Sequence, residues 1–136
     1  MVVEQNLPPD WPGIVHREGK TLTRVTGLPD SNSKGPSSKS SSCVFHNPAM
    51  AGSRTRSVLL MAHAIEAGML GNSEVRALDG LSASGLRARR WLNELPEESG
   101  SRLIATVGDM DQTALDWAMP TEADLPTKQG ELLPLP

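Results

Sequence analysis

The side chains best placed to do chemistry in this sequence are two aspartates that flank a turn of small residues. Asp79 ends an apolar run and opens the turn Asp-Gly-Leu-Ser-Ala-Ser-Gly, which closes at Gly85. Small residues let the backbone approach a ligand closely, and a helix behind such a turn offers free N–H groups. Asp109 follows a second apolar run roughly 20 residues later, where nucleotide-binding α/β folds place a carboxylate that accepts hydrogen bonds from ribose hydroxyls. The pattern predicts a site for a nucleotide-like cofactor.

The glycine spacing of this turn narrows the choice of cofactor. Gly80 and Gly85 are separated by four residues, so the turn is not the GxGxxG of dinucleotide-binding folds. It is not the GxxxxGK phosphate loop either, because Leu86-Arg87 follows the second glycine. A ligand without phosphates, such as S-adenosylmethionine, fits better. Arg87 would lie in the first helical turn, where a cation is unfavourable, which indicates a carboxylate partner such as that of the cofactor's methionine end.

Structural roles compete with these functional ones. Asp79 can act as a turn-forming residue, and Asp109 or Asp111 can cap the helix that follows. We expect Arg89 and Arg90 to be solvated positions on their helix, since charged residues usually lie on the exposed face.

The elements that must position these residues alternate between helix and strand. Apolar residues recur at spacings of three and four after Ser53, which we expect to cap the first helix. Such alternation predicts a parallel sheet with right-handed crossovers. In chain order, the predicted elements are a helix over residues 54–70, a strand over 75–81, a helix over 86–95, a strand over 103–107 and a helix over 112–118.

The predicted α/β elements occupy only the middle of the chain. Residues 1–30 form a proline-containing extension in which 21–25 alternates like an edge strand or hairpin arm. Residues 31–42 are a Ser-rich flexible linker, 43–119 a partial α/β domain, and 120–136 a disordered tail that holds no third strand. A sheet of two strands is too small for a complete domain, so we expect an α/β fold truncated after its second core strand.

Composition excludes several classes of protein. The single cysteine, Cys43, rules out an internal disulfide and a cysteine-based zinc site, and fits a reducing, cytoplasmic setting. No apolar run approaches the roughly 20 residues that span a membrane. Arginines gather around the predicted site although the net charge is −3, a local basic patch that is compatible with RNA contact. His16 and His63 lack ligand-like spacing, and we expect both to be structural.

Two blocks of sequence together resemble a known family. The first, residues 44–50 followed by Arg54, reads Val-Phe-His-Asn-Pro-Ala-Met, and the second, residues 79–87, reads Asp-Gly-Leu-Ser-Ala-Ser-Gly-Leu-Arg. Glu18-Gly19 and Gly108-Asp109 add shorter similarities. In this order, the blocks resemble the N-terminal part of tRNA (guanine(26)-N(2))-dimethyltransferases, over roughly residues 15–118.

This resemblance implies a class I, Rossmann-like methyltransferase fold that uses S-adenosylmethionine. The partner would be tRNA, and the methyl acceptor the exocyclic N2 of guanine 26. Phe45 and Asn47 would belong to the catalytic site. The cofactor would be contacted by Arg54, Asp79, Gly85, Arg87 and Asp109.

The sequence also departs from the family pattern. His46 stands where an aromatic residue is usual, and Thr55 where the family has Asp. The family's catalytic Asp-Pro-Phe-Gly motif does not occur, and neither does its C-terminal RNA-binding domain, so we expect this chain alone not to methylate tRNA. Two alternatives stay open: a nucleotide-binding oxidoreductase fragment, and a non-catalytic module that binds a partner.

Overall fold

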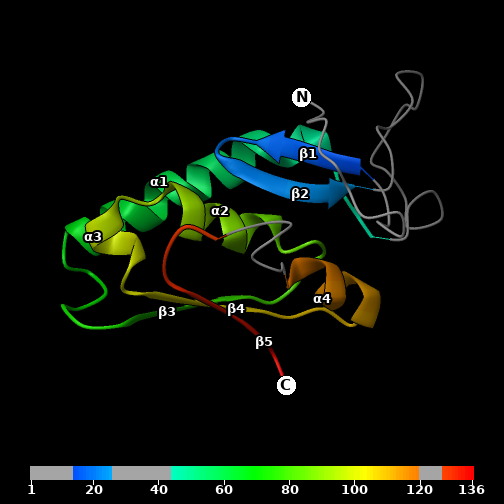
Figure 1. Ribbon diagram of the computed structural model, residues 1–136. Helices are drawn as coiled ribbons and strands as arrows, with labels where there is room; N and C mark the ends of the chain where they lie inside the picture. Colours follow the sequence, from blue (N-terminus) through cyan, green and yellow to red (C-terminus); the bar gives the residue numbers. More distant parts are fainter. Residues whose placement is uncertain (1–13, 26–43, 120–126) are drawn as a thin grey trace.

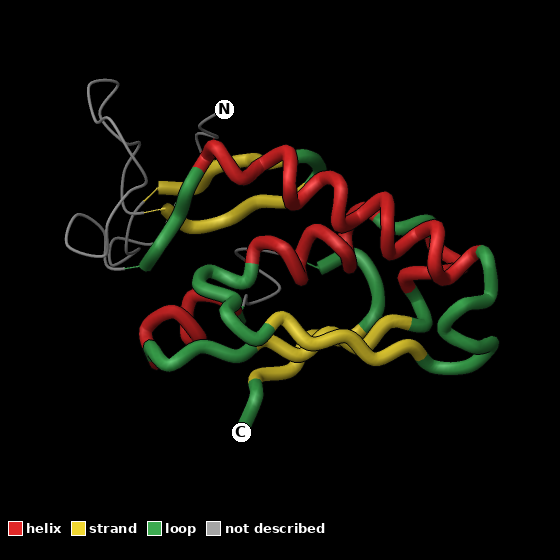
Figure 2. Tube along the Cα trace, turned by 180° about the vertical axis from the view of Figure 1, so that it is seen from behind, coloured by secondary structure: helices red, strands yellow, loops and turns green. Residues whose placement is uncertain are grey.

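The computed structural model describes residues 14–25, 44–119 and 127–136. Their helices and strands form three layers. Figure 1 shows a sheet of β3, β4 and β5 below, α2 in the middle, and the β1–β2 hairpin with α1 above. Figure 2 shows the same order from behind. Helix α2 therefore lies between the sheet and the outer layer, and both of its sides are covered.

The hairpin consists of β1 (Ile14–Glu18) and β2 (Thr21–Val25), which pair antiparallel. This confirms the predicted strand over residues 21–25. The tight turn needs Gly19, whose φ is +58°, and a Cβ there would lie 2.7 Å from Arg90 Nη2. Alternate residues of β2 are buried, and this strand packs on α2.

The first long helix starts earlier than predicted. A short 3₁₀ helix, η1 (Pro48–Met50), leads directly into α1 (Ala51–Glu66). The Asn47 side chain caps η1 by accepting a hydrogen bond from the Ala49 N–H at 3.0 Å, so the expected cap at Ser53 is wrong. The predicted end at residue 70 is also wrong, because the chain turns left-handed at Gly68 (φ +73°).

The sheet contains β3 (Val75–Asp79), β4 (Leu103–Val107) and β5 (Glu131–Pro134), parallel and in the order β3-β4-β5. The predicted mixed α/β architecture with a parallel sheet is confirmed, and it is compatible with a Rossmann-like fold. The expectation that the chain holds no third strand is wrong. The predicted linker over residues 31–42 lies outside the described residues, as does the first part of the predicted tail.

The third strand pairs with the edge of β4 that β3 leaves free. Glu131–Pro134 is short and ends in a proline, so its local pattern resembles a tail. Proline is tolerated in an edge strand, where its missing N–H faces away from the ladder. Two contacts hold the strand's approach: Lys128 N–H donates to Asn93 Oδ1 at 2.7 Å, and Gln129 Nε2 to the Leu95 carbonyl at 2.7 Å.

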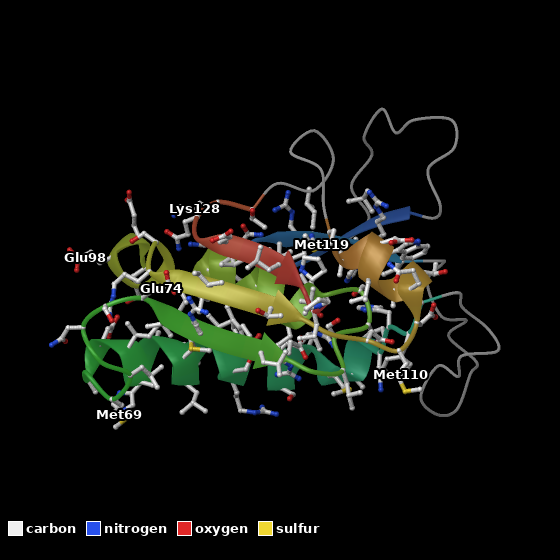
Figure 3. All side chains as sticks on the ribbon, turned by 90° about the horizontal axis from the view of Figure 1, so that it is seen from below. Met69, Glu74, Glu98, Met110, Met119 and Lys128 are labelled. Carbon is white, nitrogen blue, oxygen red and sulfur yellow. The ribbon has the colours of Figure 1, made fainter. Side chains whose placement is uncertain are left out.

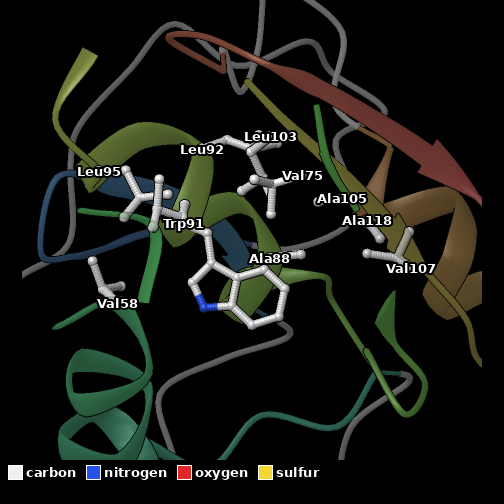
Figure 4. Close-up of a cluster of buried hydrophobic side chains, with 11 residues drawn as sticks. Val58, Val75, Ala88, Trp91, Leu92, Leu95, Leu103, Ala105, Val107 and Ala118 are labelled. Atoms are coloured by element: carbon white, nitrogen blue, oxygen red, sulfur yellow. The ribbon is translucent and has the colours of Figure 1, made fainter. Parts of the chain in front are cut away.

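The main core lies between the sheet and α2 (Leu86–Glu94). Trp91 reaches from α2 toward α1, and its indole N–H donates to the Ser57 hydroxyl at 3.0 Å (Figure 4). Two further helices, α3 (Glu97–Gly100) and α4 (Gln112–Ala118), follow α2 and β4. The predicted helices over residues 86–95 and 112–118 are thereby confirmed, with Trp91, Leu92 and Leu95 in the core.

The two arginines expected to be solvated on α2 are buried instead. Arg89 is 0% exposed and Arg90 is 3% exposed. The hairpin covers the face of α2 that would otherwise meet water, and this long-range contact overrides the usual preference of arginine for the surface.

Close packing at Gly85 gives a first testable prediction. Gly85 has φ +72°, and an added Cβ would lie 2.7 Å from Ala118 Cβ. Gly68 has nearly the same φ, +73°, but a Cβ there meets nothing within 4 Å. We expect Gly68→Ala to lower the free energy of unfolding by about 1 kcal/mol and Gly85→Ala by about 2–3 kcal/mol, because it adds a clash. Urea denaturation checks this, and equal losses would contradict the packing.

The opposite face of the sheet is open. Figure 3 looks onto this face, with α2 behind the strands. Leu78 is 59% exposed and Leu133 is 39% exposed on it. Within the three described stretches, no helix is long and apolar enough to cross a membrane.

Candidate functional site

The two sequence blocks meet in one cavity at the carboxyl end of β3. The cavity measures about 80 Å³. Ligand pockets commonly reach about 300–1,000 Å³, so this cavity has room for no more than one end of a cofactor-sized molecule. The first block contributes Phe45, His46, Asn47, Met50 and Arg54, and the second Asp79, Leu81, Ser82, Ala83, Ser84, Leu86 and Arg87.

Asp109 fastens the turn of the second block to the end of β4. Its Oδ2 accepts a hydrogen bond from the Ala83 N–H at 2.9 Å, and its Oδ1 one from the Asp111 N–H at 2.9 Å. A backbone hydrogen bond runs beside it, from the Ser82 N–H to the Gly108 carbonyl at 2.9 Å. Asp111, not Asp109, caps α4, by accepting from the Thr113 N–H at 3.0 Å. The carboxylate of Asp109 is thus directed at the predicted ligand turn.

Asp79 and Arg87 give the cavity charges of both signs. The pKa of Asp79 is raised, mainly because the carboxyl is buried. The charge of Asp109 raises this pKa further. The charge of Arg87 and a hydrogen bond from the Leu81 N–H lower it, but by less. Arg87 makes two long hydrogen bonds, to the Ser53 carbonyl at 3.3 Å and the Ser53 hydroxyl at 3.4 Å. An added cation near Asp79, or an anion near Arg87, would therefore be favoured here.

The amino end of α2 opens toward the same cavity. Gly85 is its N-cap residue and provides no side-chain hydrogen bond to the first turn, whose residues Leu86 and Arg87 line the cavity. The unpaired N–H groups of a helix start favour a negative group.

A small apolar cluster holds the first block beside the turn. Val44, 2% exposed, packs against Ala114 and Trp117 of α4, and Ala83 of the turn joins them. Phe45 follows at 39% exposure. Burial, helped by the charge of Arg54, lowers the pKa of His46 to about 4, so its imidazole is neutral at neutral pH.

A buried ion-pair network fixes the first block from the other side. Arg54 donates to both carboxylate oxygens of Glu18, at 2.7 Å each, and to the Asn47 carbonyl at 3.0 Å. Arg90 donates to the same Glu18 at 3.2 Å and, through two nitrogens, to Glu94 at 2.6 and 2.8 Å. The hairpin, α1 and α2 are thereby joined around one carboxylate.

Reasoning from the sequence missed Glu18, Arg90 and Glu94 as a unit. Arg90 and Glu94 are four residues apart, a spacing at which helical side chains pair, and this was the available signal. Glu18 lies 72 residues from Arg90, so no local pattern could have joined them.

The structure brings most predicted site residues together. Phe45, Asn47, Arg54, Asp79 and Arg87 line the cavity. Asp109 holds the turn, and Gly85 packs against Ala118. Within the described ranges, no group of three or more His, Cys, Asp or Glu side chains could hold a metal ion.

One of three comparisons with known proteins found a match to this chain. The family model for N2,N2-dimethylguanosine tRNA methyltransferase matches residues 22–118, which include both blocks and Asp109. No curated protein and no solved structure matches the chain. Since the family match covers more than half of the 136 residues, this chain belongs to the N2,N2-dimethylguanosine tRNA methyltransferase family.

Proposed function

We propose that this chain is the cofactor-binding part of a tRNA methyltransferase that modifies the exocyclic N2 of guanine 26. The cofactor is S-adenosylmethionine, which supplies the activated methyl group. The observation that carries the proposal is the meeting of both blocks in one cavity, with the Asp109 carboxylate tied to the Ala83 N–H of the turn.

The residues present fit this cofactor in charge and shape. Asp79 offers a carboxyl to the ammonium of the methionine end, and Arg87 a guanidinium to its carboxylate. Asp109 holds the turn and lies where ribose hydroxyls would donate to it. The open space at Gly80, where an added Cβ meets nothing within 4 Å, lets a ligand approach the backbone.

In this proposal, the first block faces the methyl acceptor. Phe45 lines the cavity and is 39% exposed, and Asn47 is fixed by its hydrogen bonds to Ala49 and Arg54. Arg54 contributes mainly by holding Asn47, because its guanidinium is already bound to Glu18. Catalysis of this kind rests on positioning and on an acceptor for the amine proton.

Calorimetric titration of the whole chain tests the cofactor. We expect S-adenosylmethionine to bind at one saturable site and NAD not to bind, which separates the proposal from an oxidoreductase. Asp109→Asn replaces one accepting oxygen with a donor, which repels one of the two N–H groups. We expect at least about tenfold weaker binding.

Asp116→Asn is the matched control for Asp109→Asn. Asp116 is exposed and accepts a hydrogen bond only from Gln112 of its own helix, at 2.9 Å, among the described contacts. Its replacement leaves affinity unchanged. Equal affinities for Asp109→Asn and the unaltered chain would contradict the assignment of the turn.

We also propose that methyl transfer needs the aspartate of an Asp-Pro-Phe-Gly motif. The Asp-Pro-Phe-Gly motif does not occur in the 136 residues. We expect the purified chain to bind S-adenosylmethionine without transferring labelled methyl groups to tRNA. Transfer to guanine by this chain would refute that part of the proposal while leaving the cofactor site intact.

A further inference from the structure

The open face of the β3-β4-β5 sheet lacks the second covering layer that parallel sheets normally have. Sheets made only of parallel strands are nearly always covered on both faces. Here α2 covers one face, and none of the helices labelled in Figure 1 lies below the sheet, on the other. Leu78, 59% exposed, and Leu133, 39% exposed, would be buried by a partner that docks on this face.

The strand register arranges the side chains of the open face in two rows. Buried residues alternate along β4, so Ile104 and Thr106 point away from the core and onto this face. Each row takes one residue from each strand, in the order β3-β4-β5: Arg76, Ile104 and Glu131 in the first, and Leu78, Thr106 and Leu133 in the second.

The first row carries opposite charges at its two ends. The side chain of Arg76 is 81% exposed on the edge strand β3, and its Nε donates to Glu74 at 2.8 Å. Glu131 is exposed on β5 at the other edge of the sheet, and none of the described hydrogen bonds or ion pairs involves its carboxylate. One patch therefore holds a protruding cation and an available anion.

The surface beside Glu131 is hollow. A cavity of about 560 Å³ is lined by Glu131 together with Glu74 and Arg102. Arg102 donates to the Ser73 carbonyl at 2.8 Å and to the Gly71 carbonyl at 2.9 Å, so its guanidinium is held by the loop before β3. The cavity thus has room for a cationic side chain that enters from outside and reaches the Glu131 carboxylate.

We propose that a second copy of this chain covers the open face, related to the first by a two-fold axis that runs along β4. Rotation about this axis brings β3 of each copy onto β5 of the other. Arg76 of one copy then meets Glu131 of the other, once on each side of the axis, and Leu78 meets Leu133. A two-fold interface requires a patch that complements itself in this way. The proposal goes beyond the proposed function, because the cofactor cavity takes no part in it.

Sedimentation velocity of the whole chain over a series of concentrations tests the dimer. Six side chains from each copy form a small interface, so we expect a weak dimer that is populated above about 0.1 mM. Arg76→Glu sets like charges opposite each other, and we expect the dissociation constant to rise at least about tenfold. Adding Glu131→Arg to Arg76→Glu restores opposite charges, and should return the dissociation constant to within about threefold of the unaltered chain.

Arg56→Glu is the control, because it makes the same change of charge on the exposed face of α1. It leaves the dissociation constant unchanged. The proposal is overturned if the chain stays monomeric at about 1 mM, if Arg76→Glu acts no more strongly than Arg56→Glu, or if the second charge change restores nothing. Calorimetry should give the same affinity for S-adenosylmethionine in the unaltered chain and in Arg76→Glu, so the dimer and the proposed function are tested separately.

Discussion

Glu18→Ala is expected to lower the free energy of unfolding by about 3–5 kcal/mol. Glu18 is 8% exposed and pairs with two buried arginines, Arg54 at 2.7 Å and Arg90 at 3.2 Å. Removing it leaves two buried guanidinium groups short of a counter-charge, which costs more than the pair itself contributes. Without Glu18, Arg54 is no longer held where it donates its hydrogen bond to the Asn47 carbonyl, so cofactor binding should weaken. Chemical denaturation measures the first effect and calorimetry the second.

Glu74→Ala is the matched control for Glu18→Ala. Glu74 pairs with Arg76 at 2.8 Å, but their side chains are 48% and 81% exposed. Solvent screens such a pair, so we expect a change of about 0–1 kcal/mol. Similar losses for the two variants would contradict a buried network.

The ion pairs of Glu18 also predict that the free energy of unfolding falls at acidic pH. Burial raises the pKa of Glu18, but hydrogen bonding and the positive charges of Arg54 and Arg90 outweigh this, and the net shift is downward from 4.5. A carboxyl whose pKa is lower in the folded state adds stability that is fully present above that ordinary value. This contribution is lost as the pH falls through the folded pKa. Glu18→Gln should make the free energy of unfolding depend less on pH below 4.5.

Arg89→Met is expected to raise the free energy of unfolding by about 3 kcal/mol. Arg89 is 0% exposed, and none of its three side-chain nitrogens has a hydrogen-bond partner in the described stretches. Burial, with the nearby charge of Arg24, lowers its pKa to about 10, so it still carries its charge at neutral pH. Methionine matches the unbranched stem without the buried charge. Thermal and urea denaturation check the gain.

Arg56→Met is the control for Arg89→Met, because Arg56 lies on the exposed face of α1. Its replacement should change stability by no more than about 0.5 kcal/mol. A loss of stability in Arg89→Met would show that the guanidinium has a stabilising partner, contrary to the contacts described.

Local patterns predicted the elements around the site well. The strand at 103–107, the helix at 112–118 and the turn at 79–85 each have a short-range signal: an apolar run, a cap or small residues. The cavity follows from them, because parallel strands bring Asp79 and Asp109 to the same edge of the sheet.

Long-range contacts account for what the sequence did not reveal. The burial of Arg89 and Arg90 depends on a hairpin that docks on α2 from more than 60 residues away, as the Glu18–Arg90 pair shows. The strand at Glu131–Pro134 has weak local character and is stabilised by its pairing with β4. Such contacts override local propensity, and no window of sequence contains both partners.

Amide hydrogen exchange of the whole chain, with and without S-adenosylhomocysteine, tests the central claim most directly. If the cofactor lies on the turn between the two blocks, exchange will slow at residues 80–87 and at Met110 and Asp111, beside Asp109. Residues 101–104 and 129–131, which surround a separate cavity at the other end of the sheet, will be unchanged. Slowing at that other end, or nowhere, would contradict the account.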